Sequence, residues 1–393
     1  MSASGNDGAA PARTGIWFVG ARGSVATTAA LGAAAASTGF AGRTGLVTEL
    51  PEVAAARPAP LEGLVIGGHD VIEEPLIERA MTLARGGVVP ADLVRALGDE
   101  LGEVDARIKT VARDGARPQR DLADNLEADI RAFKEAENLD RVVVVDVSST
   151  EPPVATSVTR DHLPELERAL DAGEAPLPPS SLYAYAAYRA GCPVVAFTPS
   201  PGPNFGALAE LAKENGLSWA GRDGKTGETL LKSALAPMFA TRALNVRSWA
   251  SINLLGGGDG KTLSDPTNAT SKTGTKRMGL EAMLGYPVEG PIHIDYVEDL
   301  GDWKTAWDYI TFEGFLGTKM TMQFTWQGCD SALAAPLVLD LARLVARADE
   351  AGEAGALGAL GFFFKEPLGS YEHSLGAQWR ALTEWCENLG SMS

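Results

Sequence analysis

Short apolar runs alternate with longer helical segments from the start of the chain to about residue 243. The apolar runs predict buried strands at 15–20, 45–48, 64–67, 141–147 and 193–197. The segments between them predict helices at 21–37 and 180–190 and a long, charged helical stretch over 74–138. A run as continuously apolar as 141–147 is typical of a parallel sheet that is covered on both faces. This part of the chain therefore predicts a doubly wound α/β sheet.

The pattern changes after residue 244. Further strands are predicted at 245–254, 293–297, 309–315 and 318–326. In the last of these, Met320, Met322 and Phe324 alternate with polar residues, which is the period of a sheet with one buried face. Helices return at 331–349 and at the C-terminus. We expect a loose tail over 1–13, a first domain over 14–243, an inserted sheet domain over 244–328 and a return to the first domain over 329–393.

Composition and charge narrow the classes of protein that fit this pattern. The 393 residues are 45% apolar and 22% charged, the profile of a soluble globular protein. A net charge of -17 argues against a general nucleic-acid role, because binding to a phosphate backbone needs a basic surface. Three cysteines without a CxxC pair favour a reducing cytoplasm, and no run is long enough to span a membrane. The histidines form no recognisable metal motif, so no histidine-based metal site is predicted, and whether the protein binds a metal is left open.

A glycine-rich turn joins the first strand to the first helix. It reads Gly20-Ala21-Arg22-Gly23-Ser24-Val25-Ala26, which is GxxGxxA in place of the usual GxGxxG. Glycines at this position let backbone N–H groups approach a pyrophosphate at a helix N-terminus, although a plain βα turn is the alternative. Glu49 or Asp70, each near a predicted strand end, would then bind the ribose hydroxyls. For either acid taken alone, a solvated loop position fits equally well.

A second candidate for binding phosphate is the segment 223–229, DGKTGET, which precedes a helix predicted to begin near Leu230. Free N–H groups at a helix start, together with the Thr226 hydroxyl and a lysine, form a phosphate cradle. The spacing is not that of a Walker motif, and a simply capped helix N-terminus remains the alternative.

Lysines provide the candidate chemistry. Lys272 and Lys276 share one face if their segment is helical, an arrangement that an anionic partner would explain, although a solvated face fits as well. Lys365 follows three phenylalanines, and burial there would lower its pKa toward that of a general base. A lysine snorkelling at the edge of a core is the alternative.

Three further segments carry acids beside turns or strand ends. A Gly-rich loop over 253–260 holds Asp259, and a short polar break before a strand holds Asp302 and Lys304. Asp330 and Ser331 lie where a strand passes into a helix, and either would serve as a helix cap. Each segment is ambiguous when taken alone.

These segments occur in a recognisable order. They read GARGSVATT, GGHD, DVSSTEP, PSSLYAYA, FTPSPG, GKTGETLLKS, NLLGGGDGKTLS, SKTGTK, GDWKTAWDY, FEGFLG, DSALAAPLVLDLAR and FFFKEPL. From about residue 14 to the C-terminus the chain resembles the myo-inositol phosphate synthases, in particular their shorter archaeal-like branch. No one segment is decisive, but a dozen in the right order are highly specific.

The resemblance implies a fold and a set of site residues. The fold is an α/β protein in which an NAD-binding Rossmann domain is interrupted by an α+β catalytic and tetramerisation sheet domain. The family's catalytic lysines and acids fall on Lys272, Lys276, Lys304, Lys365, Asp223, Asp259 and Asp302. Its phosphate site falls on Thr226, Gly227, Lys276 and Lys304. Its NAD contacts fall on Gly20, Ala21, Arg22, Gly23, Ser24, Val25, Asp70, Ser148, Thr198, Asp330 and Ser331.

The resemblance also implies an activity. In the family, a cytoplasmic homotetramer uses NAD to convert glucose 6-phosphate into myo-inositol phosphate by oxidation, enolisation, aldol closure and reduction. Lys272 and Lys365 would then serve proton transfer and oxyanion stabilisation, and Lys276 and Lys304 would hold phosphate and developing charge. Asp223, Asp259 and Asp302 would orient the lysines or the sugar hydroxyls. Whether the activity requires a cation is left open by the sequence.

Several residues depart from the family pattern, so the exact function remains open. Many members have different residues at the positions of Ala196, Glu228, Leu254, Gly257 and Gly258. These changes leave open the same chemistry on fructose 6-phosphate, which would close a five-membered ring. The sequence is also compatible with an NAD-dependent dehydrogenase that turns over its cofactor and with a non-enzymatic NAD sensor.

Overall fold

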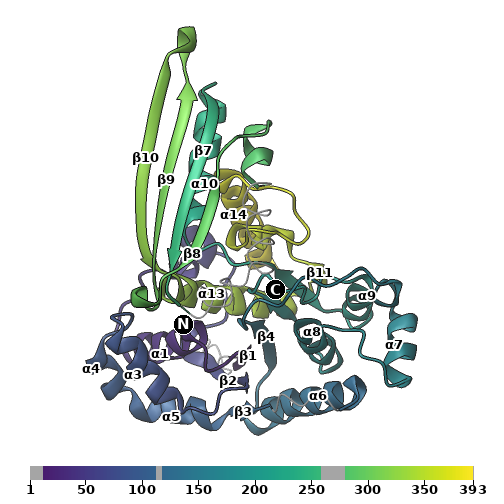
Figure 1. Cartoon of the computed structure of the whole chain (residues 1–393). Coiled ribbons are helices and arrows are strands. Elements are labelled where there is room, and N and C mark those ends of the chain that lie inside the picture. Colours follow the sequence, from purple (N-terminus) through teal and green to yellow (C-terminus); the bar gives the residue numbers. More distant parts are fainter. Residues whose placement is uncertain (1–11, 112–116, 258–278, 393) are drawn as a thin grey trace, which may run out of the picture.

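The computed structural model describes residues 12–111, 117–257 and 279–392. Figure 1 shows a parallel sheet surrounded by helices, with the long strands of a second sheet rising from it. The expected α/β fold, with a Rossmann-like parallel sheet and a second sheet, is therefore confirmed.

The first sheet has seven parallel strands in the order β11-β6-β5-β4-β1-β2-β3. Their bounds are β1 Thr14–Val19, β2 Leu64–Asp70, β3 Ile108–Thr110, β4 Arg141–Asp146, β5 Val194–Ala196, β6 Ser218–Gly221 and β11 Gly355–Ala356. Strands β3 to β6 have the 3-2-1-4-5-6 order of dinucleotide-binding sheets, in which the strand order reverses between β1 and β4. Ligands of such sheets bind at this point, beyond the carboxyl ends of the strands.

Helices cover both faces of the parallel sheet, which explains the nearly continuous apolar runs of its central strands β1 and β4. Ile16 and Phe18 of β1 pack on one face, and Trp17 and Val19 pack on the other. The first face is covered by α1 Ser24–Thr38, α2 Pro51–Ala54, α3 Leu76–Arg85, α4 Ala91–Ala96, α5 Gly98–Ala106, α13 Asp330–Glu350 and α14 Leu375–Ser391. The second face is covered by α6 Gln119–Ala136, α7 Leu163–Asp171, α8 Pro179–Arg189 and α9 Gly206–Glu214.

The second sheet has four strands in the order β10-β9-β7-β8. They are β7 Asn245–Leu255, β8 Ile292–Tyr296, β9 Trp303–Glu313 and β10 Lys319–Cys329. Strand β9 is antiparallel to both β7 and β10, whereas β7 and β8 are parallel. Helix α10, Glu228–Thr241, packs Ala236 and Phe239 against this sheet, so the start of α10 lies between the two sheets (Figure 1).

Short 3-10 turns complete the described structure. They lie at Val47–Glu49, Leu61–Gly63, Val158–Arg160, Glu298–Leu300, Phe315–Gly317 and Gly358–Phe363. No helix of the described residues has the length and apolarity needed to cross a membrane.

Two expectations about secondary structure are wrong. Residues 45–48 form no strand, because the backbone N–H groups of Val47 and Thr48 donate to the carboxylate of Asp340 on α13. The stretch 74–138 is not helical throughout, since it contains the three-residue edge strand β3. Strands β6 and β11 have four and two residues, and their apolar runs were too short to predict them.

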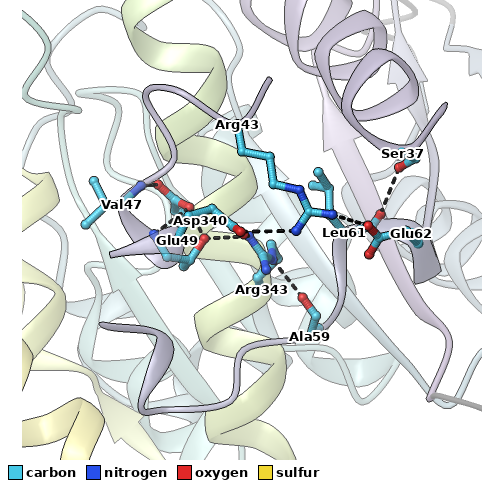
Figure 2. A network of polar contacts seen from close by, with 10 residues as sticks. Ser37, Arg43, Val47, Glu49, Ala59, Leu61, Glu62, Asp340 and Arg343 are labelled. Atoms are coloured by element: carbon cyan, nitrogen blue, oxygen red, sulfur yellow. Dashed lines mark hydrogen bonds and ion pairs between the residues drawn. The ribbon is translucent and has the colours of Figure 1, made fainter. Parts of the chain in front are cut away.

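The segment after α1 is bound to α13 by a network of charged side chains (Figure 2). Glu49 accepts hydrogen bonds from Arg43 and Arg343, at 3.1 and 2.9 Å. Arg343 also donates to the carbonyl oxygen of Ala59 at 2.7 Å, and Arg43 is paired with Glu62. Glu49 is thus held by two arginines at the surface of α13, which leaves Asp70 as the ribose candidate at a strand end.

Candidate active site

The glycine-rich turn is built close against β2. The N–H groups of Gly20 and Ala21 both donate to the carbonyl oxygen of His69, at 2.9 and 3.0 Å. Gly20 has a φ of 88°, and a Cβ there would lie 3.2 Å from the backbone nitrogen of Ser148. Helix α1 then begins at Ser24 without an acidic residue in its first turn or a side-chain cap at Gly23. Its free N–H groups are therefore open to an anion such as a pyrophosphate.

Asp70 lies at the carboxyl end of β2, beside the same turn. Its Oδ2 accepts the backbone N–H of Arg22 at 2.7 Å, and its Oδ1 accepts that of Ile72 at 2.9 Å. The Arg22 guanidinium is directed elsewhere, to an ion pair with Asp105 at 2.9 Å. The Asp70 carboxylate is fixed where an acid of a dinucleotide-binding fold would accept hydrogen bonds from ribose hydroxyls.

The other cofactor candidates continue along the same sheet edge. Ser148 follows β4, and Thr198 follows β5, the next strand in the sheet. The Thr198 hydroxyl is hydrogen-bonded to that of Ser200 at 3.0 Å, and both side chains are buried. Because these strands are parallel, their carboxyl ends meet at one edge, and the residues there fit a bound dinucleotide.

Asp146 ends β4, and it predicts how stability depends on pH. Burial raises the pKa of this carboxyl to about 6, compared with about 3.9 in an unfolded chain. Its Oδ1 accepts the N–H of Ser148 at 3.0 Å, while Oδ2 is buried without a hydrogen-bond partner. Between these two pKa values, Asp146 is ionised in the unfolded chain but protonated in the native protein. Its contribution to the stability of the native state therefore falls as the pH rises. The contribution of Asp146 to this loss between pH 4 and pH 7 is about 2 kcal/mol.

We therefore expect Asp146→Asn to lose less stability than wild type when the pH is raised from 4 to 7, because the amide does not ionise and keeps an acceptor for Ser148. Chemical unfolding at several pH values measures the difference. Parallel pH profiles for the two proteins would contradict the assignment. Asp140→Asn is a suitable control, because it makes the same substitution at an exposed aspartate that lies outside the buried sheet edge.

The catalytic candidates begin at the end of β6. Asp223 has a φ of 59°, a conformation that costs energy in a non-glycine residue and is held by its neighbours. Its N–H donates to the carbonyl oxygen of Thr198 at 3.2 Å, and its own carbonyl oxygen accepts the N–H of Lys365 at 2.7 Å. The Lys365 ammonium in turn donates to Asp223 Oδ1 at 2.7 Å. Two predicted residues, 142 positions apart, are thereby joined.

A second pair of predicted residues meets at the start of α10. Lys304 lies 3.3 Å from Asp330 Oδ2, and the Thr226 hydroxyl donates to Asp330 Oδ1 at 3.1 Å. Burial alone would raise the pKa of Asp330, but Lys304, Lys365 and the Thr226 hydroxyl outweigh it and hold this pKa below its usual value. Because both lysines act on Asp330, the two lysine–aspartate pairs belong to one site.

The capping alternatives for these two helices are wrong. Helix α10 begins at Glu228, not Leu230. Its N-cap residue is Gly227, which has no side chain to cap the helix. Helix α13 begins at Asp330, whose carboxylate is bound to Thr226 and Lys304 and caps nothing. Ser331 makes a 3.1 Å contact with Cys329 through its hydroxyl.

Of the remaining predicted catalytic residues, the structure describes only Asp302. Asp302 lies in the turn that immediately precedes β9, two positions before Lys304. Asp259, Lys272 and Lys276 lie outside the described residues.

The structure shows that Lys225, the lysine of the predicted phosphate cradle, is buried, and it adds Lys232, which the sequence did not single out. Lys225 donates to Gln378 of α14, and burial lowers the pKa of its ammonium to about 8. Lys232 forms a buried ion pair with Glu228 and donates to the Ser251 hydroxyl at 3.0 Å. The spacing of Glu228 and Lys232, four residues apart in a helix, was the available signal.

A small pocket lies beside α10. Its lining combines apolar side chains, among them Leu280, Met283 and Phe364, with the charged side chains of Asp223 and Lys365. Among the residues that the structure describes, no cluster of three His, Cys, Asp or Glu side chains is placed to hold a metal ion.

The fold is of the Rossmann class of dinucleotide-binding proteins, and it is accompanied by the lysine–aspartate pairs Lys304–Asp330 and Lys365–Asp223. The family model for myo-inositol-1-phosphate synthase matches residues 14–387. The chain belongs to this family.

Individual relatives agree over nearly the whole chain. It is 32% identical to inositol-3-phosphate synthase 1 of Bacteroides thetaiotaomicron, and the match covers 97% of this chain and 96% of that protein. A crystal structure of inositol-3-phosphate synthase from Caenorhabditis elegans has a TM-score of 0.85 at 23% identity, covering 98% of this chain and 87% of that one. A myo-inositol-1-phosphate synthase-related protein from Thermotoga maritima has a TM-score of 0.74 at 24% identity, covering 95% and 98%. The two structures support the fold.

Proposed function

We propose that the protein is an NAD-dependent cyclase that converts glucose 6-phosphate into a myo-inositol phosphate. Membership of the family and the similarity to a full-length inositol-3-phosphate synthase support this proposal. The observation that carries it is the meeting of two lysine–aspartate pairs, Lys304–Asp330 and Lys365–Asp223, beside the dinucleotide-binding sheet edge. A protein that only sensed NAD would need the sheet edge but not the lysines.

The cofactor side of the site rests on the first sheet. NAD, when bound, supplies reversible hydride transfer at C5 of the sugar. The start of α1 would hold its pyrophosphate, with Asp70 on a ribose and Ser148 and Thr198 farther along the sheet edge. In this arrangement the chain's own residues fix the cofactor without taking part in redox chemistry.

The sugar phosphate would be held at the start of α10. The N–H groups that follow Thr226 and Gly227 favour an anion, and Lys304 adds a positive charge close to them. Asp330 lies against the same lysine and the Thr226 hydroxyl, so it orients both. Binding phosphate in this way positions the carbon chain of the open sugar for ring closure.

Lys365 would act at the reacting carbons. Its ammonium, held by Asp223, stabilises negative charge on an oxygen at C5 or C1 and returns a proton to it. The family resemblance adds Lys272, Lys276, Asp259 and Asp302 to the proton transfer and charge stabilisation, as predictions. The enolised C6 then attacks the C1 aldehyde, which closes the six-membered ring.

A homotetramer in the cytoplasm, as expected from the resemblance, is part of the same proposal. It is supported by apolar side chains that are more than one-third exposed on the second sheet, including Ile252, Trp307 and Tyr309. Ile252 and Trp307 are directly paired across β7 and β9, so they lie on one face. Light scattering of the purified protein measures the oligomeric state.

The proposed activity is tested with catalytic amounts of NAD+ and each hexose 6-phosphate in turn. We expect glucose 6-phosphate to give a six-membered cyclitol phosphate that resists borohydride, without net accumulation of NADH. A five-membered product from fructose 6-phosphate would establish the alternative substrate. Net NADH formation would indicate a dehydrogenase, and no product from either sugar would indicate an NAD sensor. Reactions without NAD+ are the control.

A further inference from the structure

One row of residues crosses the second sheet beneath the start of α10. Asn253 of β7 pairs with Ala306 of β9, and Ala306 pairs with Trp326 of β10. Residues directly opposite one another share a face of the sheet, and Lys304, two positions before Ala306, lies on the same face. Ala306 contributes only a methyl group, so the larger polar side chains of the row stand on either side of it.

Two side chains in this row have buried hydrogen-bonding groups without a partner. Among the residues that the structure describes, the indole Nε1 of Trp326 is shielded from solvent and has no hydrogen-bond partner, and the same holds for both amide atoms of Asn253. Native structures rarely leave such groups unpaired, because desolvation without a hydrogen bond destabilises the fold. Their positions therefore indicate a ligand with hydrogen-bonding atoms.

The indole Nε1 lies next to the proposed phosphate cradle. A Cβ built on Gly227 would lie 3.3 Å from Trp326 Nε1, 3.7 Å from Lys304 Nζ and 3.7 Å from Asp330 Oδ1. The indole N–H and the Lys304 ammonium thus flank Gly227, the N-cap residue of α10. An indole nitrogen donates one hydrogen bond and accepts none, so its partner must be an acceptor.

We infer that Trp326 is a further phosphate-binding residue and that its Nε1–H donates to an oxygen of the sugar phosphate held at Gly227 and Lys304. The inference rests on the proposed sugar-phosphate substrate and adds a donor that the resemblance does not supply. Trp326 gives the site a hydrogen bond without another positive charge. The indole N–H is held in a fixed direction and therefore selects the position of the oxygen that it binds. The Lys304 ammonium, on a flexible side chain, does not impose such a direction.

The test compares wild type with Trp326→Phe, which keeps an aromatic ring but removes the N–H. Calorimetric titrations with inorganic phosphate and with glucose 6-phosphate, at saturating NAD, give the affinities. We expect about tenfold weaker binding of both, as for the loss of a hydrogen bond to a charged group. Trp307→Phe is the matched control, because the partly exposed Trp307 lies one register position away on the opposite face of the same sheet. It should bind phosphate like wild type.

The outcomes separate this inference from the proposed function. Equal phosphate affinities in wild type and Trp326→Phe overturn the role of Trp326 but leave the cyclase proposal intact. Weaker phosphate binding by the variant supports the donor even if wild type forms no cyclitol. If Trp326→Phe no longer binds NAD and is misfolded, a crystal structure of wild type with NAD and phosphate decides. A phosphate oxygen within about 3.2 Å of Nε1 supports the inference, and phosphate bound elsewhere or not at all overturns it.

Discussion

Replacing Lys365 by alanine is expected to lower kcat by about 10²–10⁴-fold, the usual contribution of a positioned proton-transfer or charge-stabilising group. The variant loses the ammonium that Asp223 holds at 2.7 Å and leaves that buried carboxylate without its lysine. Steady-state assays with glucose 6-phosphate measure the effect. Because Lys365 lies apart from the glycine-rich turn, NAD affinity should change little.

Two further variants make this result specific. Lys365→Met keeps most of the aliphatic stem, so it separates the loss of charge from the loss of packing. Lys319→Ala removes a lysine from the exposed start of β10 and should retain full activity. Wild-type turnover in both Lys365 variants would remove this residue from the chemistry.

Gly68→Ala is expected to destabilise the protein by about 3 kcal/mol or more and to abolish measurable NAD binding. An added Cβ would lie 2.2 Å from the carbonyl oxygen of Phe18 and 2.8 Å from the Cβ of Ala21. Both contacts involve backbone or the rigid turn, so no flexible side chain is able to give way. The strand would have to move away from the glycine-rich turn that it supports.

Denaturant unfolding and NAD titration measure the two effects of Gly68→Ala. Gly32→Ala is the matched control, because a Cβ on this exposed glycine of α1 meets nothing within 4 Å. It should stabilise the protein by about 0.5–1 kcal/mol, since alanine is the better helix former. A Gly68→Ala protein that unfolds and binds NAD like wild type would show that the turn tolerates displacement.

The sequence predicted those parts of the fold and site that depend on local pattern. The apolar run 141–147 predicts a buried parallel strand because both of its faces are covered, and β4 is found there. The alternation of Met320, Met322 and Phe324 predicts the one-sided strand β10. By contrast, β11 has two residues and exists only because β6 lies beside it, so no local pattern marks it.

Local sequence patterns do not predict contacts between side chains that lie far apart along the sequence. The sequence proposed Asp330 either as a helix cap or as a cofactor contact, and the structure adds carboxylate contacts with Thr226 and Lys304 that no local pattern marks. Glu49 was a ribose candidate until the structure showed it held by Arg43 and Arg343. The unpartnered indole of Trp326 had no signal in the sequence, because only the register of three strands and the start of α10 bring it to Gly227.

The last forty or so residues supply the strand β11, the helix α14 and Lys365, all packed against elements made much earlier in synthesis. A ribosome adds roughly 5–20 residues each second. For the seconds before this segment emerges, the nascent chain lacks the edge strand β11 and the covering helix α14. It also lacks Lys365, one of the proposed catalytic residues. Truncation near residue 350 would accordingly leave an incompletely folded chain with exposed apolar surface, which chaperones and proteases would bind. It would not give a folded enzyme with a lower rate.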